Sequence, residues 1–336
     1  MDKRRKMMLF SLLMTLAMAI MTGCGGNEKK EDVKGSQETA DESQVEENKT
    51  QEDEQQVKEG DRTKYPLTIT DSLGNEVTIQ KEPERVVSLA PADTEILFAL
   101  GAGDRVKGRT DYCSYPEEAS EVESIGTYTS PNTELILSME PDVIFASDYI
   151  DDSIKEQVES TGAKTVVFSA NSVEEVQDVI LQAGQILNLN EKAKELTDSM
   201  KADLKELQDT VASVKAPKSV FVDIGSFYSA GPGSLLADML DKMGVNNIAA
   251  DTEEAYPQIS VEAIIEKNPD IYLSLYSTPE EIKKTAGLNE LECIKNDNII
   301  FYEALSEEAD VVQRPSPRVV EGMRLLAEQI YPDLFQ

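Results

Sequence analysis

The side chains that could carry out chemistry in this chain are mostly carboxylates, because the sequence has 64 Asp and Glu residues and no His. Without imidazole, the chain lacks the usual general base of serine and cysteine hydrolases and the usual ligand of zinc or copper. Two carboxylates can hydrolyse a glycosidic bond, but so many acids make chance pairs inevitable, and no motif marks two of them. The composition and the motifs therefore mark no catalytic residue, and a hydrolase is kept only as an alternative.

Cysteine chemistry is limited to three residues, Cys24, Cys113 and Cys293. Cys113 and Cys293 lie far apart in the sequence and show no Cys-x-x-Cys spacing, so no metal site is expected. In an exported protein the two could form a disulfide, and two free thiols are the equal alternative. The sequence does not decide between a disulfide and two free thiols.

The N-terminal residues have the features of an export signal. A basic segment, residues 3–6, precedes an apolar run over residues 7–21, which is too short to span a membrane convincingly. The run ends in Met21-Thr22-Gly23-Cys24, which resembles the bacterial lipobox, where small residues precede a cysteine that is lipidated. We therefore predict a signal peptide over residues 1–23, lipidation of Cys24 and a location on the outer face of the cytoplasmic membrane. A secreted protein with a chance cysteine is the alternative.

The segment that follows, residues 24–64, is strongly polar. Its only bulky apolar residues are Val33, Val45 and Val57, so it cannot bury enough apolar surface to offset chain entropy. We predict a disordered acidic tether that spans roughly 35 Å. The whole chain has a net charge of −32, which argues against binding to nucleic acid and against direct adhesion to anionic lipid.

A duplicated segment indicates how the rest of the chain is built. Residues 132–145 and 260–273 share an Asn or Ser that can cap a short helix, and an acid follows two positions later. These acids are Glu134 and Glu262. In both copies a Pro-Asp pair then ends the helix and precedes a strand with a buried pattern. The duplication predicts two related lobes.

Strand and helix patterns alternate in both copies, which predicts an α/β fold of two lobes with mainly parallel central sheets. Strands are predicted at residues 85–89 and 219–222, near the start of the first and second lobe respectively. Between the lobes, apolar residues repeat at intervals of three and four from Ala193 to Val214, which predicts one long rigid helix. The predicted organisation is an N-terminal lobe over residues 65–188, a linking helix over 189–215 and a C-terminal lobe over 216–336.

These features together resemble one family, the helical-backbone solute-binding lipoproteins of ABC importers for vitamin B12, ferric siderophores and haem. The resemblance covers about residues 65–332. Three segments resemble the cobalamin-binding branch in particular, namely Tyr112-Cys113-Ser114-Tyr115-Pro116, Tyr256-Pro257-Gln258 and Gln313-Arg314-Pro315-Ser316-Pro317-Arg318. In that branch a Trp follows the first Pro-Asp strand, whereas Ser147 stands here with Tyr149 nearby, and the chain has no Trp.

The resemblance implies a ligand cleft between two lobes that move little on binding. At the matching motif positions it implies that Tyr115, Tyr256 and Arg314 line this cleft, together with Tyr128 and Tyr228, where the family also places aromatic residues. Tyrosines offer both ring area and a hydroxyl to a flat corrin or porphyrin. The guanidinium of Arg314 could pair with a phosphate or propionate. The alternatives are half-buried surface tyrosines and a structural ion pair.

The same resemblance implies that Glu134 and Glu262 dock on arginines of a permease, one acid from each lobe. The alternative is that an acid in the first turn only favours the helix dipole. The expected partners are the permease with its ATPase subunits, the ligand and, through the lipid anchor, the membrane. The protein is expected to be a monomer without a cofactor.

The ligand implied by the resemblance is cobalamin or another corrinoid. The first alternative is a ferric siderophore or haem, and in the absence of His only Tyr or Met could ligate haem iron. Two other classes stay open, an exported hydrolase and a sensor or chaperone of a surface complex.

Overall fold

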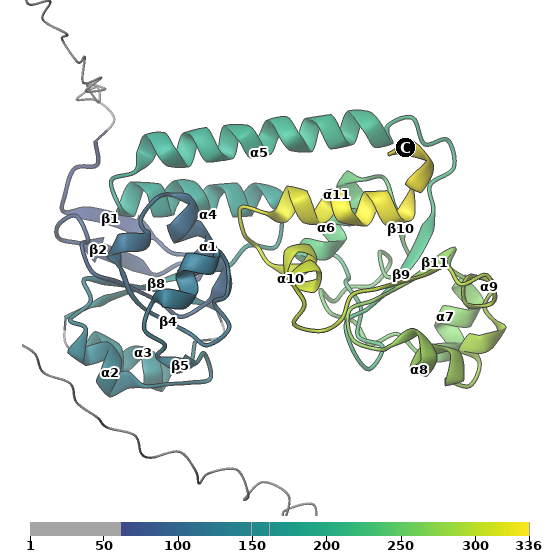
Figure 1. Ribbon diagram of the computed structural model, residues 1–336, viewed down its shortest axis with the longest axis horizontal. Coiled ribbons are helices and arrows are strands. Elements are labelled where there is room, and N and C mark those ends of the chain that lie inside the picture. The colour runs from purple at the N-terminus through teal and green to yellow at the C-terminus, as the bar shows by residue number, and fades with distance from the viewer. Residues whose placement is uncertain (1–61, 149, 161, 336) are drawn as a thin grey trace, which may run out of the picture. The chain divides into compact units, whose positions relative to one another are not determined.

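The computed structural model describes residues 62–148, 150–160 and 162–335, which form two α/β lobes joined by the long helix α5 (Figure 1). The predicted signal peptide, Cys24 and almost all of the predicted tether lie outside the described residues, as does Tyr149. Within the described residues, no helix is both long and apolar enough to cross a membrane. The predicted fold class, two lobes with parallel sheets joined by one long helix, is confirmed.

The N-terminal lobe is built around a parallel sheet with the strand order β4-β3-β7-β8. Its strands are β3 (Val86–Ser88), β4 (Val106–Arg109), β7 (Val143–Ser147) and β8 (Lys164–Phe168). Two antiparallel hairpins join β1 (Leu67–Thr70) to β2 (Glu76–Ile79) and β5 (Gly126–Thr127) to β6 (Ser130–Pro131). The helices are α1 (Pro91–Ala99), α2 (Thr133–Ser138), α3 (Asp152–Glu159) and α4 (Val173–Ile186), with short 3₁₀ turns η1 (Gly103–Arg105) and η2 (Glu117–Glu121).

The C-terminal lobe repeats this topology with the strand order β10-β9-β11-β12, all parallel. Its strands are β9 (Ser219–Asp223), β10 (Asn246–Asn247), β11 (Ile271–Ser274) and β12 (Ile299–Phe301). The helices are α6 (Leu235–Lys242), α7 (Val261–Lys267), α8 (Pro279–Lys284), α9 (Glu292–Lys295), α10 (Glu307–Gln313) and α11 (Val319–Ile330), with 3₁₀ turns η3 (Leu288–Glu290) and η4 (Pro332–Leu334). In each parallel sheet the strand that comes second along the chain, β4 or β10, lies at the edge beside the strand that comes first, β3 or β9. The duplication seen in the sequence therefore extends to the topology.

The duplicated segments have the same structural roles in both lobes. The side chain of Asn132 accepts a hydrogen bond from the backbone of α2, and Ser260 does the same for α7. Asp142 Oδ2 accepts from the backbone N–H of Arg85 (3.1 Å) at the start of β3, and Asp270 Oδ2 accepts from the N–H of Ser219 (2.8 Å) at the start of β9. Asp142 therefore holds the start of β3 to the start of β7, and Asp270 holds the start of β9 to the start of β11.

Replacement of Asp142 by Asn is expected to lower the free energy of unfolding by about 1 kcal/mol at pH 7, because charge-assisted hydrogen bonds are lost. Burial opposes the charged form of Asp142, but the Lys81 ammonium and the N–H groups of Glu84 and Arg85 outweigh it and lower its pKa. Such a group stabilises the fold above the pKa of the unfolded chain, about 3.9, and this contribution is lost as pH falls through the lowered pKa. Urea unfolding at pH 7 and in acid measures the effect.

The difference between Asp142→Asn and the unmodified protein should shrink as the pH falls below about 4. Asp203→Asn, at an exposed position of α5, is the matched control and should show no comparable difference at either pH. A difference that persisted undiminished in acid would show that the lost charge is not its cause.

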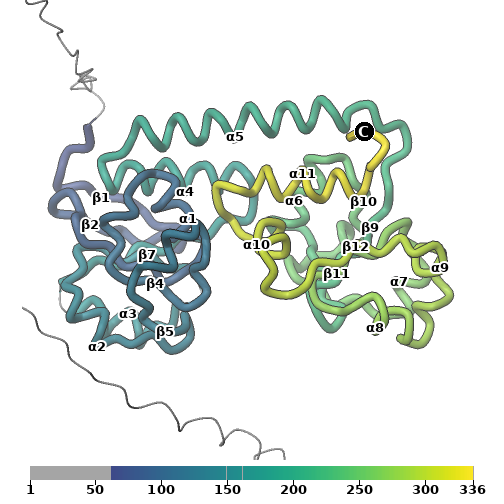
Figure 2. The backbone as a smooth tube through the Cα atoms, in the orientation of Figure 1, coloured from purple at the N-terminus to yellow at the C-terminus, as the bar shows by residue number. Residues whose placement is uncertain are grey.

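Helix α5 (Asn190–Val211) packs on both lobes along its length. Its 22 residues extend about 33 Å at 1.5 Å per residue. Its buried residues recur every three or four positions, at Ala193, Thr197, Met200, Leu204, Leu207 and Val211. They face α4 of the N-terminal lobe and α11 of the C-terminal lobe, which runs beside α5 (Figure 2). Gly184 lets α4 approach α5 closely, since a Cβ at position 184 would lie 2.4 Å from the Cβ of Ala193.

Candidate functional site

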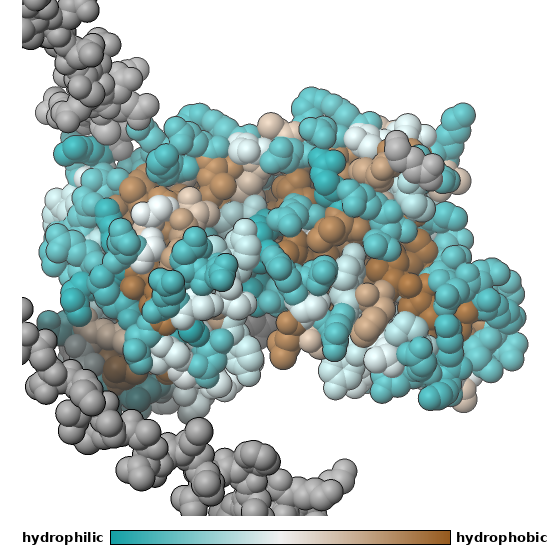
Figure 3. Space-filling model, viewed as in Figure 1, coloured by the Kyte–Doolittle hydropathy of each residue, from teal (hydrophilic) through white to brown (hydrophobic). Residues whose placement is uncertain are grey.

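A cavity of about 570 Å³ lies between the two lobes. Its N-terminal wall follows the carboxyl ends of three parallel strands, with Leu89 and Ala90 after β3, Ser147 and Asp148 at the end of β7, and Phe168, Ser169 and Ala170 at the end of β8. The C-terminal lobe contributes Leu235, Tyr256, Gln313, Arg314 and Pro315. The carboxyl ends of parallel strands are where open α/β sheets bind ligands. Figure 3 shows apolar side chains beneath α5 and over the C-terminal lobe, among surfaces that are mostly hydrophilic.

Two of the four predicted tyrosines line this cavity from opposite lobes. Tyr128 belongs to the N-terminal lobe and is 46% exposed, while Tyr256 belongs to the C-terminal lobe and is 47% exposed. Ser147, at the position where the cobalamin-binding branch has a Trp, also lines the cavity. A small side chain there leaves space that an indole would fill. The cavity therefore has a tyrosine on each side, and Phe168 adds a third aromatic ring from the N-terminal lobe.

The other two predicted tyrosines lie outside the residues that line the cavity. The ring of Tyr115 is covered by the guanidinium of Arg318, whose Cζ lies 3.6 Å from the ring centroid. The backbone of Tyr228 forms an antiparallel bridge with Gln258, two residues beyond Tyr256. Both tyrosines keep exposed edges, and their ligand-binding role stays a prediction.

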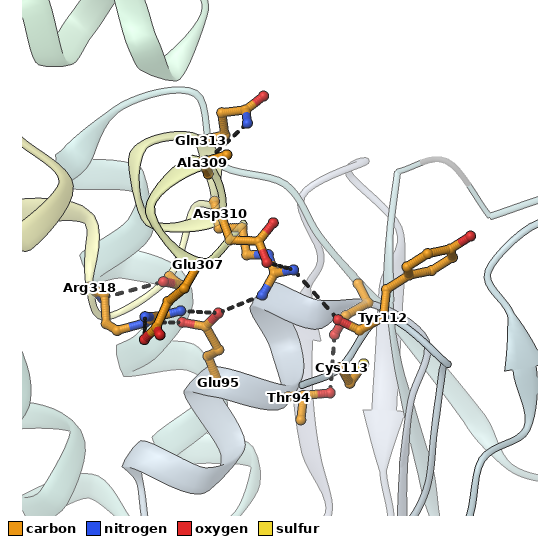
Figure 4. A network of polar contacts seen from close by, with 12 residues as sticks. Thr94, Glu95, Tyr112, Cys113, Glu307, Ala309, Asp310, Gln313 and Arg318 are labelled. Carbon is orange, nitrogen blue, oxygen red and sulfur yellow. Dashed lines mark hydrogen bonds and ion pairs between the residues drawn. The ribbon is translucent and has the colours of Figure 1, made fainter. Parts of the chain in front are cut away.

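A buried ion-pair network connects the lobes beside the cavity (Figure 4). Glu95 of α1 is only 2% exposed, and its carboxylate accepts two hydrogen bonds of 3.0 Å from Arg318 of the C-terminal lobe. Arg314 donates a third bond of 3.0 Å to the same carboxylate. Arginine with carboxylate in this two-pronged geometry is among the strongest hydrogen-bonded pairs in proteins. Glu95 therefore holds two guanidinium groups from the opposite lobe.

Arg314 lies both at the cavity wall and in the ion-pair network. It lines the cavity, but its guanidinium is already paired with Glu95 and also with Asp310 of α10. The positive charge is thus compensated by two carboxylates of the protein itself. The structural ion pair is present, and the pairing with a ligand anion stays a prediction.

Asp93 is a cavity residue that the sequence analysis did not identify. It lies in the first turn of α1, lines the cavity and is 3% exposed. Its Oδ2 has no hydrogen-bond partner among the described residues. Burial raises the pKa of Asp93 to about 8, so the neutral acid predominates at pH 7. The sequence feature that could have identified Asp93 is an acid in the first turn of a helix that continues with apolar residues.

The two cysteines left open by the sequence are both free and buried. Cys113 Sγ lies 3.2 Å from Thr110 Oγ1, and burial raises the pKa of its thiol. Burial also raises the pKa of Cys293 to about 11. Both thiols are therefore protonated at neutral pH and are poor nucleophiles. In the described part of the chain, no group of three or more acidic, Cys or His side chains is placed to hold a metal ion.

The two acids predicted to dock on a permease lie in matching places. Glu134 is exposed in the first turn of α2, and Glu262 is exposed in the first turn of α7. Both helices lie on the side of their lobe away from α5 (Figure 1). Their docking role stays a prediction.

Comparison with protein families gives the context for this geometry. Residues 86–305 match the family model described as periplasmic binding protein. The chain belongs to the periplasmic binding protein family. Membership confirms the solute-binding role that the sequence analysis predicted, and it agrees with a cavity between two lobes at the carboxyl ends of the strands.

Individual members of the periplasmic binding protein family are similar over most of the chain. The uncharacterized ABC transporter substrate-binding lipoprotein YvrC of Bacillus subtilis is 32% identical over 331 residues, 96% of each chain. A cobalamin-binding protein of Halobacterium salinarum is 26% identical over 80% of this chain and 74% of its own length. The crystal structure of a possible iron-binding, periplasmic solute-binding protein of Staphylococcus epidermidis is 30% identical with a TM-score of 0.68, over 75% of this chain and all of that one.

Proposed function

We propose that this chain is the lipid-anchored solute-binding protein of an ABC importer and that its ligand is cobalamin or a related corrinoid. The observation that carries the proposal is the pair Tyr128 and Tyr256, which flank one cavity from opposite lobes. Two tyrosine rings on opposite walls suit a broad flat ligand, because each contributes ring area and a hydroxyl. The cobalamin-binding relative supports the same ligand.

The charges around the cavity favour a ligand without strong negative charge. Of the charged side chains that line it, Arg314 is paired with Glu95 and Asp310, while Asp148 is acidic. A haem propionate or an anionic siderophore would have to compete with these carboxylates for the guanidinium. A corrinoid ring edge made of neutral carboxamides meets no such competition. A ferric siderophore or haem is the alternative ligand, and the possible iron-binding neighbour supports it.

The proposal places the protein outside the cytoplasmic membrane as a monomer held by a lipid on Cys24. The lipoprotein relative, similar over nearly the whole chain, supports the anchor. The permease and its ATPase subunits are the proposed partners, with Glu134 and Glu262 as the docking residues. No cofactor and no catalytic step are part of this role.

Isothermal titration of the chain without its signal peptide, with Cys24→Ser to prevent lipidation, tests the ligand. Cyanocobalamin, haemin and ferrichrome are titrated in parallel. We expect one-to-one binding of cyanocobalamin with a Kd below about 1 µM, a standard free energy of about −8 kcal/mol, and at least tenfold weaker binding of the other two. Tighter binding of haemin or ferrichrome would refute the cobalamin assignment and leave the importer role.

A further inference from the structure

Asp93 is a polar group at the cavity wall that the protein leaves unsatisfied. Its side chain is 97% buried, and Oδ2 has no partner among the residues that the structure describes. An unpaired polar atom away from water destabilises a folded protein, because its hydrogen bonds to solvent are not replaced. The residue nevertheless lies at the wall of a cavity that both lobes line with predicted ligand residues. Oδ2 itself is closed to solvent, so a ligand in that cavity can supply the missing partner once the side chain turns toward it.

The surroundings of Asp93 determine what kind of partner it can accept. Its pKa, raised by burial to about 8, makes the side chain a neutral acid at pH 7, with one O–H donor and one C=O acceptor. The charged residues that line the same cavity are Arg314, which is paired with Glu95, and Asp148. The nearby thiol of Cys113 is neutral. Asp93 thus offers a donor beside an acceptor and no charge.

We propose that Asp93 is a ligand-binding residue that recognises a carboxamide group at the edge of the ligand. A carboxamide presents a C=O and an N–H side by side, which is the complement of an acid O–H and C=O. A carboxylate on the ligand would offer two acceptors and would face only one donor. The inference rests on the proposed function, since the edge of a corrin ring carries carboxamides and the edge of haem carries carboxylates.

The test compares Asp93→Leu and Asp93→Asn with the unmodified residue, all in the Cys24→Ser chain without signal peptide. Without ligand, Asp93→Leu is expected to melt at a higher temperature, because an unpaired buried polar group is replaced by an apolar one. With cyanocobalamin, the same variant is expected to bind about tenfold more weakly. Asp93→Asn, which retains a donor and an acceptor, should stay within about twofold of the unmodified affinity.

Three results would overturn the inference. If Asp93→Leu lowered the melting temperature of the ligand-free protein, Asp93 would be a structural residue. If Asp93→Leu bound cyanocobalamin as tightly as the unmodified protein, Asp93 would not contact the ligand, although the proposed function would stand. If Asp93→Asn lost as much affinity as Asp93→Leu, a donor beside an acceptor would not be enough for binding, and recognition of a carboxamide would be wrong. Failure of the unmodified protein to bind cyanocobalamin while it binds haemin would refute the carboxamide ligand and the cobalamin assignment together.

Discussion

Replacement of Glu95 by Ala is expected to lower the free energy of unfolding by about 3–5 kcal/mol. The change leaves the guanidiniums of Arg314 and Arg318 largely buried at the lobe boundary without their shared carboxylate. A buried charge that loses its partner is strongly destabilising, because neither protein nor water replaces the lost hydrogen bonds. Urea unfolding of the chain without its signal peptide, followed by circular dichroism, measures the loss.

Glu307→Ala is the matched control for this prediction. Glu307 also binds Arg318, at 3.3 Å, but its side chain is 71% exposed, so its loss should change the free energy of unfolding by less than about 1 kcal/mol. Equal effects of the two substitutions would show that burial of the Glu95 network does not contribute to stability. Because Glu95 and Arg318 belong to different lobes, the Glu95 variant should also expose more of the lobe boundary to hydrogen exchange.

Reversal of charge at both docking acids, Glu134→Lys with Glu262→Lys, is expected to reduce cobalamin uptake by cells at least tenfold. If the two acids dock on arginines of a permease as proposed, each substitution places a cation opposite an arginine, and like charges across an interface cost several kcal/mol. Both acids are exposed and neither lines the cavity, so the affinity for cyanocobalamin should be unchanged. Uptake of labelled cyanocobalamin and titration of the purified variant separate docking from ligand binding.

The control for the docking prediction is Glu191→Lys with Asp203→Lys. Both residues are exposed on α5, away from α2 and α7, and Glu191 lies in the first turn of its helix, as the docking acids do. The control therefore reproduces the full charge change, and the helix-dipole effect at one of the two positions, without the docking position. Normal uptake by the Glu134 and Glu262 double variant, with only a small loss of stability, would leave the helix dipole as the role of these acids.

Three of the five ligand-binding residues predicted from the sequence line the cavity, namely Tyr128, Tyr256 and Arg314. Short motifs predict Tyr256 and Arg314, while Tyr128 is predicted from the family's aromatic positions. Tyr115 belongs to an equally specific motif, yet its ring lies beneath Arg318 outside the cavity lining. A motif predicts which residues lie near a cleft, whereas the direction of each side chain depends on neighbours that are distant in the sequence.

The sequence by itself determined the two lobes, their parallel sheets and the long helix between them. These features depend on local patterns, such as the helix caps Asn132 and Ser260 and the apolar repeat of α5, which act between residues a few positions apart. Only the tertiary structure decided that Glu95 pairs with Arg318, 223 residues away, and that Asp93 is buried without a partner. The Glu95 pair depends on how the two lobes meet, and the burial of Asp93 depends on how the chain packs around the cavity. Burial and long-range pairing are properties of that packing and not of any local pattern.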